Sequence, residues 1–165
     1  MRTSLLQVVL AVAVVGGIAC EGPDAITLPV TAWTAVLTPA DEVPAVTGSS
    51  AAGTATFALM TGRTDSVDYT ITIQTLPGTT ITAAHLHQAA AGATAVVAVD
   101  LCGAGTAPAC TALGAPGVLI SGRRFITATH LTQMRAFGMY VNVHTTANAG
   151  GEIRGQLRIV PTDPE

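Results

Sequence analysis

Lysine is absent from this chain of 165 residues, and all seven of its basic residues are arginine. Charged residues make up only 10% of the chain and aromatic residues 4%, with a single tryptophan and a formal net charge of -3. A nucleic-acid-binding domain usually carries a basic face. The composition therefore argues against a nucleic-acid-binding protein.

Long apolar runs are confined to the N-terminus. The mean hydropathy is +0.53, yet after residue 20 no run approaches the roughly 20 apolar residues that a membrane-spanning helix needs. Arg2 is the only charged residue before Glu21, and an apolar stretch follows it up to Val15. A positive end, an apolar stretch and small residues are typical of a secretory signal. We therefore expect residues 1–19 to be removed on export.

Cys20 follows Gly-Ile-Ala, which is the pattern of a bacterial lipobox, although a larger aliphatic residue usually stands at the position of Gly17. We expect Cys20 to carry lipid and to anchor the exported protein to a bacterial membrane, on its periplasmic or extracellular face. Residues 20–31 would form a tether, and Glu21 favours the outer membrane of a two-membrane cell. Simple secretion and an uncleaved N-terminal anchor are the alternatives.

Two further cysteines, Cys102 and Cys110, bracket a loop rich in glycine, alanine, threonine and proline. Export would bring them into an oxidising compartment, where disulfides persist. We expect a disulfide between them, which would stabilise the fold by about 2.6 kcal/mol through loop entropy. The alternative is a pair of free thiols, since their spacing matches no standard metal-binding pattern.

Apolar and polar residues alternate with a period of two along most of the remaining chain, which is typical of strands with one buried face. Turn residues separate the runs. A short helix is expected after Thr129, with Leu131 and Met134 on its buried side and Gly138 at its end. The expected strands cover residues 33–37, 54–60, 67–74, 81–87, 95–101, 118–120, 139–144 and 153–159.

These elements predict one all-β domain over residues 32–160, followed by a tail at 161–165. The domain is long enough to bury a substantial core. About seven or eight antiparallel strands with short turns and one helical connection favour a Greek-key β-sandwich or barrel behind the N-terminal signal segment.

His85 and His87 are candidates for metal ligands. They alternate with Ala84 and Leu86, which are the better core residues. Because side chains at alternate positions leave the same face of a strand, both imidazoles are expected on the outer face.

The strand expected at 139–144 adds a third candidate, since its alternation directs Tyr140, Asn142 and His144 outward. If the two strands are neighbours, His144 joins the other two histidines on one outer face. Three imidazoles suit copper or zinc, and Asn142 would then help to orient them. The alternative is that these are ordinary surface or hydrogen-bonded histidines, as we expect for His130.

Glu152 and Arg154 share a strand face with Gln156. We expect an ion pair between Glu152 and Arg154 that orders the preceding turn. Alternatively, one of them orients an imidazole of the histidine cluster. The sequence has no Ser-His-Asp spacing, nucleotide-binding glycine loop or nucleophile elbow, so it argues against an enzyme and leaves an enzyme of another kind as an open alternative.

Five segments carry a family resemblance: Glu-Val-Pro-Ala-Val at 42–46, residues 53–59, Ala-His-Leu-His at 84–87, Tyr-Val-Asn-Val-His-Thr at 140–145 and Gly-Glu-Ile-Arg-Gly-Gln-Leu at 151–157. In this order they resemble the CHRD domain, a module named after chordin and found in many exported bacterial proteins. Gln88 and the alanines after it stand where the family tends to have glycine. The resemblance implies an exported all-β domain, and the growth-factor antagonism of chordin does not transfer to such a chain.

A second resemblance is to the copper/zinc superoxide dismutases, in which a His-x-His strand is followed much later by a histidine and an Asn-Ala-Gly-Gly turn. His85, His87 and His144 match this pattern and would correspond to copper ligands. Residues 88–127 contain no bridging histidine, and Glu152 replaces the arginine expected after the glycines. The resemblance thus implies a three-histidine copper site without dismutase activity.

Two functions follow as hypotheses. The first is a non-catalytic, lipid-anchored module of the cell envelope that has a structural role or binds a protein or polysaccharide. The second is an envelope protein that binds copper or zinc through the three histidines, for storage, sensing or redox chemistry. The distances among the imidazole nitrogens discriminate between them, because a histidine more than about 8 Å from the others would end the metal hypothesis.

Overall fold

The structure is a computed structural model that describes residues 31–76, 78–110 and 118–161. The expected signal segment, Cys20 and most of the expected tether and tail lie outside the described residues. Within the described ranges, no helix has the length and apolarity to cross a bilayer.

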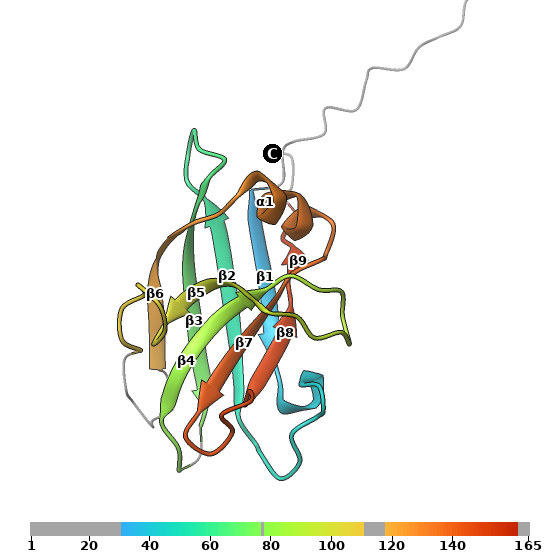
Figure 1. Cartoon of the computed structure of the whole chain (residues 1–165), viewed down its shortest axis with the longest axis vertical. Coiled ribbons are helices and arrows are strands. Elements are labelled where there is room, and N and C mark those ends of the chain that lie inside the picture. The colour runs from blue at the N-terminus through green and yellow to red at the C-terminus, as the bar shows by residue number, and fades with distance from the viewer. Residues whose placement is uncertain (1–30, 77, 111–117, 162–165) are drawn as a thin grey trace, which may run out of the picture.

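Two antiparallel sheets form a sandwich, which confirms the expected all-β fold (Figure 1). Sheet A has the strand order β6-β3-β2-β1-β9, and sheet B has the order β5-β4-β7-β8. The elements are β1 (Ala32–Leu37), the 3-10 helix η1 (Pro39–Asp41), β2 (Ala52–Leu59), β3 (Ser66–Thr75), β4 (Ile81–His87), β5 (Val97–Cys102), β6 (Val118–Phe125), α1 (Ala128–Arg135), β7 (Tyr140–Thr145), β8 (Ile153–Gln156) and β9 (Arg158–Ile159).

The core lies between the sheets and follows from the alternation along each strand. In β1, Trp33 and Leu37 are fully buried, whereas Val36 between them is 67% exposed. Burial of the inward apolar side chains is the main force that holds such a sandwich together. The other fully buried side chains include Ala55, Val67, Ile71 and Ile73 from sheet A, and Ala84, Leu86, Leu101, Val141, Val143 and Ile153 from sheet B.

Strand β6 is longer than the run expected at 118–120, because it pairs with β3 as far as Phe125. The sequence concealed this extension because glycine and arginine interrupt the apolar pattern. Gly122 faces the ring of Tyr69, where a Cβ atom would lie 3.0 Å from the Tyr69 hydroxyl oxygen. Arg124 donates to the carbonyls of Asp100 and Leu101 at 2.8 and 2.7 Å.

The single strand expected at 153–159 divides into β8 and β9, which join different sheets, so the described residues form nine strands. The division occurs where the chain passes close to β1. At Gly155 a Cβ atom would lie 2.1 Å from the carbonyl oxygen of Val36, so only glycine fits this approach. Leu157 is fully buried at the crossing point between the two strands.

The expected helix is present, but it begins and ends earlier than predicted. Thr127, not Thr129, caps it: the Thr127 hydroxyl accepts from the amide of His130, whose Nδ1 accepts from the amide of Thr127. This reciprocal pair is a capping box with histidine in the third helical position. The helix ends at Arg135 rather than at Gly138, and Leu131 and Met134 are buried as expected.

Cys102 and Cys110 form the predicted disulfide, with their Cα atoms 4.9 Å apart. Cys102 is the last residue of β5 and is fully buried. The bond closes the loop that follows β5 and holds it against the edge of sheet B.

Candidate metal centre

Three histidines project from two neighbouring strands of sheet B. In β4, Ala84 and Leu86 are fully buried in the core, so His85 and His87 leave the opposite face. Strand β7 pairs with β4 and places His144 beside Ala83 in the same ladder. All three imidazoles therefore lie on one face, as the sequence predicted.

The imidazoles converge. Nδ1 of His85 lies 3.0 Å from Nε2 of His144, and the His85 and His87 ring centroids are 5.8 Å apart. One ligand nitrogen from each ring can be chosen so that all three lie within 4.8 Å of one another. Nitrogens bound to one ion at about 2.0–2.1 Å lie roughly 3–4 Å apart, so small side-chain rotations would close the site around an ion.

Backbone carbonyls fix the tautomer of two of these rings. Nδ1 of His87 lies 2.9 Å from the oxygen of Ala95, and Nδ1 of His144 lies 2.9 Å from that of Ala149. Because a carbonyl only accepts hydrogen bonds, Nδ1 carries the proton and Nε2 keeps its lone pair. A carbonyl behind the ring is the usual support of a metal-binding histidine.

Two of the outward ring nitrogens are buried without a partner. In the described structure, Nε2 of His85 and Nε2 of His87 make no hydrogen bond. Burial lowers the pKa of His85 to about 4, assisted by the nearby His144 and His87, and burial also lowers the pKa of His87. Both imidazoles are therefore neutral at neutral pH, which is the form that binds metal.

The outer face of sheet B is covered, which the sequence did not predict. We call residues 88–96, between β4 and β5, the strap; Figure 1 shows it crossing in front of β7 and β8. The strap contacts polar groups beneath it: His87 at Ala95, Arg154 at the oxygen of Ala93 (2.7 Å) and Gln156 at that of Ala89 (3.1 Å). His87, which contacts the strap, is 8% exposed; His85 is also 8% exposed, whereas His144 is half-buried.

The expected ion pair between Glu152 and Arg154 is wrong. These two side chains, both in the described part of the chain, form no ion pair with each other. Glu152 accepts hydrogen bonds from Ser49, from Thr145 (2.8 Å) and from Asn148 (2.6 Å). Burial alone would raise the pKa of Glu152, but these bonds together hold it below its usual value. Glu152 thus orders the turn through hydroxyl and amide donors.

Arg154 takes part in a stack that ends at a candidate ligand. Its guanidinium lies 3.4 Å from the ring centroid of Tyr140, and that ring is stacked on His87 with centroids 4.7 Å apart. Such a cation–π contact, shielded from water, is worth more than an exposed one. Arg154 therefore supports the orientation of His87 through Tyr140.

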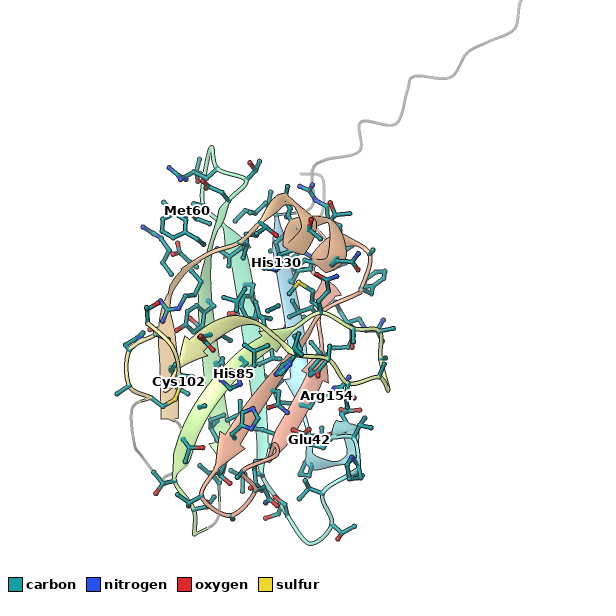
Figure 2. All side chains as sticks on the ribbon, viewed as in Figure 1. Glu42, Met60, His85, Cys102, His130 and Arg154 are labelled. Carbon is teal, nitrogen blue, oxygen red and sulfur yellow. A yellow bond between two sulfur atoms is a disulfide. The ribbon has the colours of Figure 1, made fainter. Side chains whose placement is uncertain are left out.

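Asn142 has a different partner from the one expected. It lies opposite His85 in the β4–β7 ladder, and its Nδ2 donates to both oxygens of Glu42, at 2.7 and 3.0 Å. Burial raises the pKa of Glu42 to about 7, partly opposed by the charge of Arg154. Figure 2 labels His85, Arg154 and Glu42 on this side of sheet B.

Sequence reasoning missed Glu42 and Asp100 as neighbours of the site. Glu42 lies in a proline-flanked segment with no periodicity, so no signal placed it against β7. Asp100 lies opposite His85 in the β4–β5 ladder, with Oδ1 3.6 Å from His85 Nε2. The only available signal was that Asp100 is the single charged residue of an otherwise apolar strand.

The described residues thus define a disulfide-bonded, all-β sandwich with a three-histidine cluster beneath a covered sheet face. The chain matches the CHRD domain family model over residues 33–157, and it therefore belongs to the CHRD domain family. No curated protein and no solved structure matches it.

Proposed function

We propose that this CHRD domain binds one copper or zinc ion through His85, His87 and His144. The observation that carries the proposal is the pair of buried, unpartnered Nε2 atoms on His85 and His87, beside an imidazole of His144. A buried polar atom without a partner is costly, and a metal ion would remove this cost for at least one of them.

The ligand chemistry favours copper and zinc over other common ions. Neutral imidazoles suit these metals, whereas calcium and magnesium prefer oxygen ligands. Three protein ligands would leave a coordination position for water or a small ligand, as in zinc sites that bind substrate. His144 is the most exposed of the three and marks the side from which an ion can enter.

Calorimetric titration of the full chain in mild detergent tests this function. Zinc and copper should each bind with one ion per chain. The double variant His85→Ala/His87→Ala should lose more affinity than the 10–100-fold typical of groups behind the ligands. The matched control is His130→Gln, because glutamine keeps the capping box of α1. Equal, weak heats for the original chain and the double variant would overturn the metal proposal.

The alternative is a non-catalytic module that binds a protein or polysaccharide of the envelope. The observation that favours it is the edge strand β5, which among the described strands pairs only with β4 and has Val97 exposed at its start. Arg124 occupies the carbonyls of Asp100 and Leu101 further along β5, so the start of this edge is the part that could accept a strand from a partner. It is the function that would remain if the titration showed no metal binding.

We further propose that the domain is exported and held at a bacterial membrane by lipid on Cys20. The support is the N-terminal sequence: one positive charge, an apolar stretch and a cysteine after small residues. An envelope location would also place the disulfide and the metal centre in an oxidising compartment.

A further inference from the structure

His85 differs from the other two histidines in the surroundings of its second ring nitrogen. His87 and His144 each donate from Nδ1 to a backbone carbonyl. His85 instead directs Nδ1 at Nε2 of His144, 3.0 Å away, and its own Nε2 is buried without a hydrogen bond. Oδ1 of Asp100 lies 3.6 Å from this unpartnered nitrogen.

The tautomers explain why this last gap is wide. Nε2 of His144 keeps its lone pair, so Nδ1 of His85 must carry the proton that joins the two rings. Nε2 of His85 then presents a lone pair to a carboxylate oxygen of Asp100. Two acceptors cannot form a hydrogen bond, and the separation of 3.6 Å is beyond hydrogen-bond distance.

The fold keeps the Asp100 carboxylate at this position. Asp100 lies directly opposite His85 in the β4–β5 ladder. Gly105 makes room for it: a Cβ atom there would lie 2.2 Å from Oδ2 of Asp100, and the φ of Gly105 is +55°. Gly105 belongs to the loop that the Cys102–Cys110 disulfide closes.

We propose that Asp100 positions His85 in the metal centre by accepting a hydrogen bond from its Nε2–H, which commits His85 to bind the metal through Nδ1. This inference rests on the proposed metal-binding function. Binding through Nδ1 would require the His85 proton to move by way of water from Nδ1 to Nε2, which would leave the Nδ1 lone pair free for the ion. The ring is neutral before and after, so no net proton is released.

Asp100 would also give the centre its charge balance. The carbonyls behind His87 and His144 are neutral, whereas Asp100 places a full negative charge behind His85. Carboxylate, histidine and metal in a row raise the basicity of the ligand and hold its ring in place.

Zinc affinity of the full chain in mild detergent, measured by calorimetry, tests the role of Asp100. Asp100→Ala should weaken zinc binding by 10–100-fold, and Asp100→Asn, which keeps an acceptor, should recover part of this loss. Asp68→Ala is the matched control, because Asp68 is an exposed strand carboxylate paired with Arg123. The zinc affinity of this variant should equal that of the original chain. Far-UV circular dichroism confirms that each variant is folded.

Nitrogen-15 NMR of the imidazoles tests the same proposal without any substitution. In the zinc-bound protein, His85 should be protonated at Nε2, and His87 and His144 at Nδ1. Unchanged zinc affinity in Asp100→Ala, or coordination of His85 through Nε2, would overturn the role of Asp100 while leaving zinc binding intact. Absence of zinc binding by the original chain would instead overturn the proposed function, and this role with it.

Discussion

Glu42 is a buried carboxyl group whose ionised form is disfavoured by its surroundings. It is 8% exposed, and its two oxygens accept from one amide, Asn142 Nδ2. Oδ1 of Asn142 is itself buried without a partner. Burial raises the pKa of Glu42 from 4.5 to about 7. Between these two pH values Glu42 stays protonated in the folded protein but is ionised in the unfolded chain.

The substitution Glu42→Gln should remove a pH dependence of stability. Because the folded pKa is raised, the stability that protonated Glu42 contributes is present at pH 4.5 and is lost as the pH rises to about 7. The loss is on the order of 3 kcal/mol. Glutamine stays neutral, still accepts from Asn142 and can donate to its Oδ1. Urea unfolding should therefore show equal stability at pH 4.5 and a more stable variant at pH 8.

Asp68→Asn provides the comparison for this experiment. Its ion pair with Arg123 lowers the pKa of Asp68, so this carboxylate stays ionised over the whole range. Asp68→Asn should follow the pH trend of the original chain. Other titrating groups, such as His85, contribute equally to both proteins. Parallel stability curves for Glu42→Gln and the original chain would show that Glu42 is not protonated in the fold.

At the scale of elements, the strap covers part of the outer face of sheet B, the face that carries the histidine cluster. It is held by side chains of β7 and β8 as much as by its own backbone. The amide of Ala95 donates to the hydroxyl of Tyr140 at 3.4 Å, and Arg154 reaches the oxygen of Ala93 while lying over the same tyrosine ring.

Replacement of Arg154 by lysine should loosen the strap. Lysine keeps the charge but loses the planar contact with Tyr140 and the fork of donors. A loss of about 1.4 kcal/mol corresponds to tenfold faster local opening, so the amides of Ala93 and Ala95 should exchange about tenfold faster with solvent deuterium. The control is Arg158→Lys, whose guanidinium lies 5.5 Å from the centroid of Phe137. Unchanged exchange in Arg154→Lys would mean that the remaining contacts suffice to hold the strap.

The strands could be predicted from the sequence because their signal is local. Alternation along β4 and β7 gave the face of each histidine, and the pairing of these strands brought the cluster together. The strap could not be predicted, because alanine and threonine at 88–96 carry no periodicity and its contacts come from distant strands. Asp100 and Glu42 were missed for the same reason, because their contacts with the site come from distant parts of the chain. The single strand expected at 153–159 was wrong because Gly155 passes close to β1, which no local pattern indicates.

At the scale of the whole molecule, the two outer faces show how the domain folds with so few charged residues on its surface. The outer face of sheet A carries threonine at consecutive outward positions of β2 and β3, which pair across the strands as Thr54 with Thr72 and Thr56 with Thr70. Threonine suits a pleated, half-exposed surface without adding charge. The strap covers part of the outer face of sheet B, where the polar side chains of His87, Asn142 and Arg154 are buried rather than exposed.

The proposed lipidation of Cys20 would place this molecule at a membrane, and Cys20→Ser tests that proposal. Stable anchoring needs more than one lipid chain or a spanning helix, since a single acyl chain binds membranes only reversibly. The original protein should therefore sediment with membranes, resist extraction by high salt and enter solution in detergent. Cys20→Ser should lose the lipid mass and appear in the soluble fraction, because the net negative charge of the chain disfavours binding to anionic lipids.

Fractionation and intact mass together distinguish the three alternatives for the N-terminus, which are a lipid anchor, simple secretion and an uncleaved anchor. A lipid anchor gives a membrane-bound original protein, a soluble Cys20→Ser variant and a mass increase located at Cys20. Simple secretion gives two soluble proteins without added mass. An uncleaved anchor gives two membrane-bound proteins that retain residues 1–19, because 18 uncharged residues after Arg2 can just span a bilayer. Either of the last two results would contradict lipidation without bearing on the proposed metal site, since its candidate ligands all lie in β4 and β7.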